Sequence, residues 1–173
     1  GETFAVPVNG PKVVSMMRGS KTSLRGQLAK VYFKKFGRAA PQQALADALL
    51  VLDGMAQEAD PAPLYLRVAT AGDQTWIDLG DTTGRAIRVS STEWSIESQP
   101  PVLFKRTALM SPLPLPEHGG DLDLLWQRLN VAVDDRAIIV AWLVAALMPG
   151  MPHPILTLSG EQGTGKSNAQ RTV

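Results

Sequence analysis

Eight consecutive residues near the C-terminal end of the chain have the types and spacing that bind phosphate groups. They match the pattern G-x-x-x-x-G-K-[ST] at every fixed position and are Gly160, Glu161, Gln162, Gly163, Thr164, Gly165, Lys166 and Ser167. The glycines allow backbone turns that bring successive N–H groups around one phosphate group. The pattern predicts a site for a nucleoside triphosphate, and it leaves the choice between ATP and GTP open.

Two side chains of this pattern have expected chemical roles. Lys166 would reach the β- and γ-phosphate oxygens and is the candidate catalytic residue, and the Ser167 hydroxyl would be one ligand of Mg²⁺. The variable positions would contact phosphate through their backbone. A chance match in a chain of this length is expected about once in a hundred chains or less. The pattern therefore favours nucleotide binding over an accidental glycine-rich turn.

The loop requires a strand before it and a helix after it. Residues 154–158 are short and apolar, which predicts a buried strand that runs into the loop. The helix is expected to begin at about Gly165 and to add N-terminal amide donors to the site. The chain starts without methionine and ends at Val173. We therefore expect a piece of a longer reading frame, and binding by the piece alone is a separate question.

Two helices between Thr22 or Ser23 and Asp60 are expected to form an αα-hairpin. The first helix, of about fifteen residues, should follow an N-cap at Thr22 or Ser23 and stop at Gly37, and Pro41 should begin the second. The two helices are expected to pack face to face or against the next part of the chain. The expected core stripes are Leu24, Leu28, Val31 and Tyr32 in the first helix, and Ala44, Leu45, Ala48, Leu49, Leu52 and Met55 in the second.

Short alternating apolar runs between residues 64 and 96 predict an antiparallel meander of about four strands. Residues 102–104 are a further candidate edge strand. Trp76 and Trp94 are expected to fill a small core, although a sheet with exposed aromatic and arginine side chains can also stack single-stranded bases. The basic side chains expected on the sheet are Arg67, Arg85, Arg88, Lys105 and Arg106.

Three aspartates, Asp73, Asp78 and Asp81, lie close together along this meander. Their pattern is typical of turn-forming residues and an outward face, and it favours this interpretation over a metal site. His118 and His153 have no ligand spacing around them. The sequence therefore predicts neither a zinc site nor a histidine-based active site.

Residues 111–120 are rich in proline and glycine and form the expected boundary between two parts. The sequence predicts an α+β N-terminal part in residues 1–110, with a helix pair and a small antiparallel β-meander. Residues 121–173 are expected to begin a P-loop α/β (AAA-like) NTPase domain. Its first helix should cover residues 122–129, capped by Asp121. Its second should run from Asp134 or Asp135 to about Met148, buried against the sheet of that domain.

Charge is distributed unevenly along the chain. Residues 1–40 contain eight basic side chains and one acidic side chain, a net charge of +7, so the remainder carries −6. Such an asymmetry suggests a polyanion partner, although a solvated helix face is the commoner explanation. The absence of cysteine fits a cytoplasmic protein and excludes disulfides. The candidate DNA-contacting residues are Lys21, Arg25, Lys34, Lys35 and Arg38.

Several segments together resemble a known family; they are residues 64–68, 76–80, Trp94, 101–106, 119–122, 141–143 and 160–163. The chain is similar, from about Leu24 to Ser167, to the N-terminal half of ATP-binding proteins of bacterial phages and mobile elements, of the superfamily-three-like or primase-associated helicase type. The resemblance implies an AAA-like ATPase core, ATP with Mg²⁺, hexamers in related helicases, and work on DNA replication. Family roles carry over only to Gly160, Gly163, Gly165, Lys166 and Ser167.

These observations support two hypotheses of different class. In the first, the parent protein is an ATP-driven DNA helicase, and a second acidic motif, a sensor residue and an arginine finger are expected downstream. In the second, the first hundred or so residues bind DNA or a protein partner, beside a regulatory or degenerate ATPase. A metabolic kinase is less favoured, because that activity does not need an N-terminal region of helices and a β-meander before the phosphate-binding loop.

Overall fold

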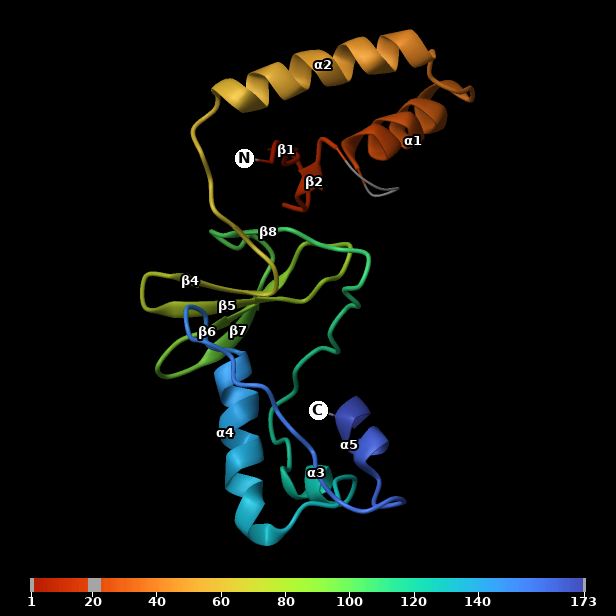
Figure 1. Ribbon diagram of the computed structural model, residues 1–173. Helices are drawn as coiled ribbons and strands as arrows, with labels where there is room; N and C mark the ends of the chain where they lie inside the picture. Colours follow the sequence, from red (N-terminus) through yellow and green to blue (C-terminus); the bar gives the residue numbers. More distant parts are fainter. Residues whose placement is uncertain (1, 19–22, 173) are drawn as a thin grey trace. The chain divides into compact units, whose positions relative to one another are not determined.

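A computed structural model describes residues 2–18 and 23–172 of the chain (Figure 1). The chain divides into two compact units, residues 1–113 and residues 114–173. Unit 1 combines two helices with small sheets, and unit 2 contains helices, so the fold is mixed α and β. No helix in the described ranges is both long enough and apolar enough to cross a bilayer.

The two helices of unit 1 are α1 (Leu24–Phe36) and α2 (Gln42–Glu58). Gly37 ends α1 in the left-handed conformation, with φ of 68°, and its N–H donates to the Phe33 carbonyl oxygen. Pro41 occupies the N-cap position of α2. The Gly37 boundary confirms the sequence prediction, whereas α2 begins one residue later than predicted, at Gln42. Ser23 is the N-cap residue of α1 but makes no capping hydrogen bond through its side chain, and Thr22 lies outside the described residues.

The expected core stripes of α1 and α2 are only partly covered. Neither helix contains a buried residue. Contacts join α1 to α2 and α2 to the first strand of the chain, so each helix is covered along one narrow side. The expectation of a packed core along both stripes was therefore wrong for Val31, Ala44, Ala48 and Met55, which are exposed.

A four-stranded antiparallel meander forms the main sheet of unit 1 and confirms that part of the prediction. Its order follows the sequence, and the Trp76–Arg88 pair shows the register between its second and third strands. The strands are β4 (Val68–Ala71), β5 (Gln74–Asp78), β6 (Ala86–Val89) and β7 (Trp94–Glu97).

Two short ladders accompany the meander. β1 (Phe4–Ala5) pairs antiparallel with β2 (Ser15–Met16), and β3 (Leu64–Tyr65) pairs parallel with β8 (Leu103–Phe104). Residues 103 and 104 therefore pair with β3 and do not extend the meander, contrary to one sequence expectation. The chain bends between β3 and β4, which separates β3 from the main sheet. The core of unit 1 contains Ala69, Trp76, Ala86, Val102 and Phe104.

Asp78 occupies the interior of unit 1, which corrects its expected outward position. Its side chain is 1% exposed, and both of its oxygens accept hydrogen bonds from Arg106, at 2.9 and 2.6 Å. The last three residues of β5 are all buried, so strand alternation does not turn this carboxylate toward water. Arg106 compensates the charge from a position 28 residues later.

Unit 2 contains α3 (Asp123–Trp126), the 3₁₀ turn η1 (Val133–Asp135), α4 (Arg136–Ala146) and α5 (Lys166–Thr172). Helix α3 is shorter than expected. Its N-cap residue is Leu122 and not the predicted Asp121, although the Asp121 Oδ1 accepts a hydrogen bond of 2.8 Å from the Asp123 N–H. The core residues are Leu129, Ile139 and Ala169, with Leu125, Trp126, Val131, Leu143, Leu156 and Leu158 packed against them.

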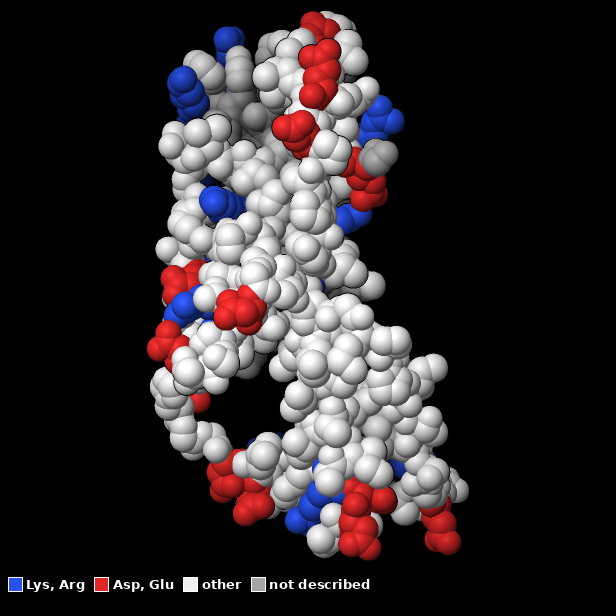
Figure 2. All heavy atoms as spheres, turned by 90° about the vertical axis from the view of Figure 1, so that its left-hand side faces the viewer, with Lys and Arg blue, Asp and Glu red and all other residues white. Residues whose placement is uncertain are grey.

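Helix α4 is not enclosed by the described residues, contrary to the expectation of a fully buried helix. Ile139 is its only buried residue among those described, whereas Ile138 and Val144 are more than half exposed. Its partners lie on one side, where Ile139 and Leu143 meet the core of unit 2. Residues 137–160 contain no charged side chain. Figure 2 shows a white surface area, without basic or acidic side chains, above the charged side chains at the bottom of the view.

Candidate phosphate-binding site

The eight residues of the phosphate-binding pattern form a loop that leads directly into α5. Gly163 and Gly165 have φ values of 87° and 82°, a region that other residues rarely adopt. Lys166 is the first residue of α5. The sequence pattern therefore coincides with a change from irregular backbone to helix at the position that it predicts.

The loop folds around the ammonium group of Lys166. The Nζ atom donates hydrogen bonds to the carbonyl oxygens of Gly160, at 2.8 Å, and Glu161, at 2.6 Å. The Thr164 hydroxyl donates to the same Glu161 oxygen at 2.8 Å. These contacts close the loop into a ring, with its positive charge on the inside and only partly exposed to solvent.

Backbone N–H groups on this ring are free to donate. In the described part of the chain, the amides of Gly163, Gly165, Lys166 and Ser167 have no intramolecular acceptor. All but Lys166 belong to exposed residues. Together with the Lys166 ammonium group, these donors could bind an anion with several oxygen atoms, such as a polyphosphate.

The segment before the loop is extended but is not part of a ladder. Residues 154–158 pair with no other strand among the described residues, so the predicted buried strand is not present as such. Its side chains still alternate: Leu156 and Leu158 pack on the core of unit 2, whereas Ile155 is 92% exposed. The Trp142 Nε1–H fixes the start of the segment by donating to the Pro154 carbonyl oxygen at 2.7 Å.

A second element contacts the loop from the connection between α3 and η1. The Asn130 side chain donates a hydrogen bond of 3.4 Å from Nδ2 to the Thr164 carbonyl oxygen. Sequence reasoning missed this residue, because nothing in the local pattern around Asn130 marks a partner 34 positions away. The loop is thus contacted by a residue that lies outside the phosphate-binding pattern.

The residues fit a Mg²⁺ site that receives most of its ligands from the nucleotide and water. Ser167 is exposed at the start of α5 and can supply one hydroxyl oxygen. The described residues contain no cluster of three or more histidine, cysteine or acidic side chains that could hold a metal. Mg²⁺ commonly uses only one or two protein ligands beside phosphate oxygens and water.

Comparisons with known proteins add no information about this site. No family model, curated protein or solved structure matches this chain. The resemblance noted in the sequence is therefore a hypothesis, supported only by the residues that suggested it.

The basic side chains on the sheet of unit 1 are engaged within the protein. Arg85 bonds to Asp81, Arg88 to Glu93 and Glu97, Lys105 to Glu2, and Arg106 to Asp78. Arg67 donates to the carbonyl oxygens of Asp78 and Ser111. Trp76 is buried in the core. These contacts disfavour the sheet as a surface for stacking single-stranded bases.

Four basic side chains on α1 and directly after it have no such partners. Within residues 2–18 and 23–172, Arg25, Lys34, Lys35 and Arg38 form no ion pair, and all four are exposed. Lys35 lies over the ring of its neighbour Phe36, with Nζ 5.4 Å from the ring centre. Lys21, the fifth candidate for DNA contact, lies outside the described residues.

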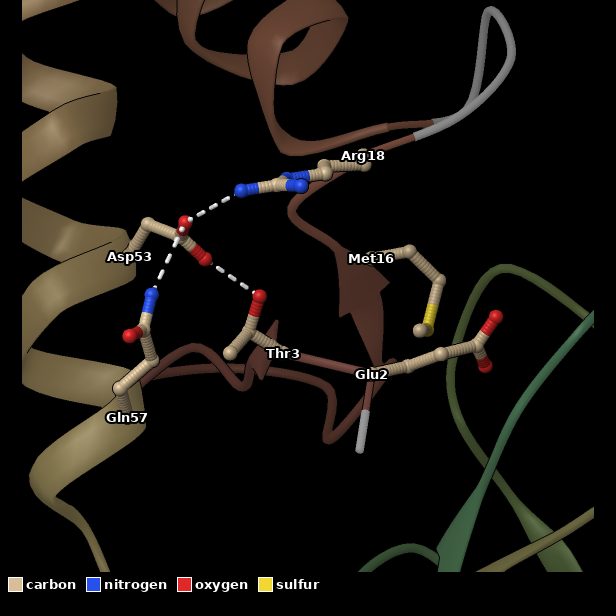
Figure 3. Close-up of a pocket in the computed structure, with 6 residues that line it drawn as sticks. All are labelled: Glu2, Thr3, Met16, Arg18, Asp53 and Gln57. Carbon is tan, nitrogen blue, oxygen red and sulfur yellow. Dashed lines mark hydrogen bonds and ion pairs between the residues drawn. The ribbon is translucent and has the colours of Figure 1, made fainter.

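A polar cluster between the N-terminal segment and α2 was not foreseen (Figure 3). Asp53 accepts hydrogen bonds from the Thr3 hydroxyl, from Gln57 and from Arg18, beside a cavity of about 460 Å³. The Thr3 hydrogen bond lowers the pKa of Asp53; burial opposes this effect, and the Arg18 charge adds to it. The cluster fastens the N-terminal segment to α2, and its hydrogen-bonding groups already bond to one another.

Asp81 has a structural role in the turn between β5 and β6. Burial alone would raise its pKa, but hydrogen bonds from Thr83 and Arg85 outweigh burial and lower the pKa to about 2. The Asp81 Oδ1 accepts from both the backbone N–H and the hydroxyl of Thr83, at 2.9 and 2.7 Å. This pattern is that of a turn-forming aspartate, as the sequence predicted.

Proposed function

We propose that residues 160–167 bind the phosphate groups of a nucleoside triphosphate, with ATP and Mg²⁺ as the expected ligands. The observation that carries this proposal is the Lys166 ammonium group, which lies inside a closed loop and bonds to the carbonyl oxygens of Gly160 and Glu161. An ammonium group in a loop whose neighbouring backbone amides have no intramolecular acceptor among the described residues favours a polyanion. The complete sequence pattern supports the same ligand.

Each residue has a separate part in this proposal. Lys166 would bind the β- and γ-phosphate oxygens, and the amides of Gly163 and Gly165 would donate to phosphate oxygens. Ser167 would hold Mg²⁺, which neutralises phosphate charge when it is bound. Hydrolysis additionally needs an acidic residue and a group that orients water, so our proposal for this chain is nucleotide binding.

Removal of the Lys166 ammonium group tests the proposal directly. We expect Lys166→Ala to weaken binding of ATP–Mg²⁺ to the full chain at least about tenfold, because a hydrogen bond to a charged group contributes about 1.5–3 kcal/mol. Isothermal titration calorimetry measures the change, and GTP in place of ATP establishes base preference.

The matched control is Lys34→Ala, which removes an exposed lysine from α1 in the other unit. We expect the control to bind ATP like the wild type, and both variants to unfold in urea at the wild-type midpoint. Wild-type affinity in Lys166→Ala would show that this loop is not the nucleotide site.

The wider proposal is that the site belongs to an ATP-driven, helicase-like replication ATPase of a phage or mobile element. It is supported only by the resemblance of the segments from residue 64 to residue 163. A hexamer would follow for the whole parent protein. The first check is whether the reading frame continues with an apolar strand that ends in two acidic residues.

A second candidate function is contact with DNA through α1. The observation that favours it is the contrast within unit 1: the basic side chains of the sheet are bonded internally, whereas Lys34, Lys35 and Arg38 are exposed and unpaired within the described residues. Unpaired cations release condensed counterions when they meet a phosphate backbone. This contact is compatible with the nucleotide site and also with a binding module beside a regulatory ATPase.

The test replaces Lys34, Lys35 and Arg38 together by alanine in the full chain. We expect weaker duplex DNA binding and a slope of log K against log salt that falls by about 0.9 for each lost phosphate contact. Fluorescence anisotropy at several salt concentrations measures both. The control has the same net charge and replaces three other exposed cations, Lys12, Arg128 and Arg171. Equal losses in the two triple variants would indicate a general charge effect and exclude a specific surface on α1.

A further inference from the structure

One side chain from outside the phosphate loop holds its backbone. The Asn130 Nδ2 donates to the Thr164 carbonyl oxygen at 3.4 Å. Among the described residues, no other side chain from outside residues 160–172 bonds to the loop. The backbone around Asn130 is itself fixed, since Leu129 is 4% exposed and Val131 packs on the same core. The contact therefore joins the loop to a packed part of unit 2.

The hydrogen bond determines where the next amide points. The Thr164 carbonyl group and the Gly165 N–H belong to one planar trans peptide, so they point in opposite directions. Because Asn130 binds the oxygen, the Gly165 N–H faces away from Asn130, and it has no intramolecular acceptor in the described chain. A glycine with φ of 82° tolerates other backbone conformations easily. Without an external contact, this peptide could rotate.

We propose that Asn130 is a positioning residue of the phosphate site. Its side-chain amide fixes the Thr164–Gly165 peptide in the orientation that offers the Gly165 N–H to a phosphate oxygen. This inference rests on the proposed function and deepens it. If it is correct, the connection between α3 and η1 contributes to triphosphate binding, although it lies outside the phosphate-binding pattern.

The first measurement uses the free protein. In ¹H–¹⁵N NMR spectra of the full chain, we expect Asn130→Ala to shift the Gly165 amide resonance, because the peptide that contains this N–H loses its external contact. The control is Gln127→Ala, which removes an exposed side-chain amide three residues earlier with no hydrogen bond to the loop. A Gly165 resonance that is unchanged in Asn130→Ala overturns the proposal.

The second measurement compares two ligands that share a triphosphate. We expect Asn130→Ala to weaken binding of ATP–Mg²⁺ and of inorganic tripolyphosphate by the same factor, about 3- to 10-fold, the range for one neutral hydrogen bond. Asn130→Gln retains the donor and should recover part of the loss. Weaker binding of ATP with unchanged binding of tripolyphosphate would mean that Asn130 contacts the nucleoside, and it would overturn the positioning role.

The two proposals fail in different ways. If the wild-type chain binds neither ATP nor tripolyphosphate, the proposed function is wrong, and with it the part of Asn130 in binding. If the wild type binds both ligands and Asn130→Ala binds them equally well, with an unchanged urea midpoint, only the positioning role is wrong.

Discussion

Two arginine–carboxylate pairs on the sheet of unit 1 show how burial decides the importance of a charge. In the Arg106–Asp78 pair, the side chains are 18% and 1% exposed. In the Arg88–Glu93 pair, they are 26% and 63% exposed. Water can solvate Glu93 when Arg88 is removed, but it cannot easily solvate Asp78. Removing the arginine therefore costs more folding stability at the buried pair than at the exposed pair.

This difference gives a prediction for single substitutions. Arg106→Ala should lower the free energy of unfolding by about 3–5 kcal/mol, because it leaves a buried carboxylate without its partner. Arg88→Ala should lower it by less than about 1 kcal/mol. Urea unfolding at neutral pH measures both. Similar losses in the two variants would contradict the argument from burial.

At the scale of elements, the sequence predicts those helices, turns and strands that are determined by residues within or next to them. Gly37 ends α1 and Pro41 precedes α2 because their own backbone preferences act at those positions. The phosphate loop likewise follows from the spacing of glycines and Lys166. Four strands of the meander follow from short alternating runs separated by turn residues.

The elements that the sequence did not predict depend on distant partners. β1 and β2 have two residues each, and only their mutual pairing defines them. The position of Asp78 depends on Arg106, 28 residues later. The contacts of Asn130 with Thr164 and of Thr3 with Asp53 join residues that are 34 and 50 positions apart. No local pattern in the sequence carries such information, because the chain must fold before these groups meet.

At the scale of the whole molecule, each unit has a core built from its own residues. The core of unit 1 includes Trp76, and that of unit 2 includes Leu129, Ile139 and Ala169. Unit 2 comprises residues 114–173 and has three buried apolar side chains in its core among those described. A domain of about sixty residues is marginal even with a full core, since it buries a small share of its surface. We therefore expect unit 2 to be the less stable unit.

This expectation can be tested because each unit contains two tryptophans, Trp76 and Trp94 in unit 1 and Trp126 and Trp142 in unit 2. Double Trp→Phe variants leave fluorescent reporters in one unit at a time. We expect the unit 2 reporters to change at lower urea concentration than the unit 1 reporters. If residues 160–167 bind the nucleotide as we propose, ATP–Mg²⁺ at about 100 times its Kd should stabilise unit 2 by about 2.7 kcal/mol and leave the unit 1 transition unchanged, since binding would require the folded loop. Coincident transitions that ATP shifts together would instead mean that the chain unfolds as one cooperative body, in which case a ligand bound at Lys166 stabilises the sheet as much as the loop.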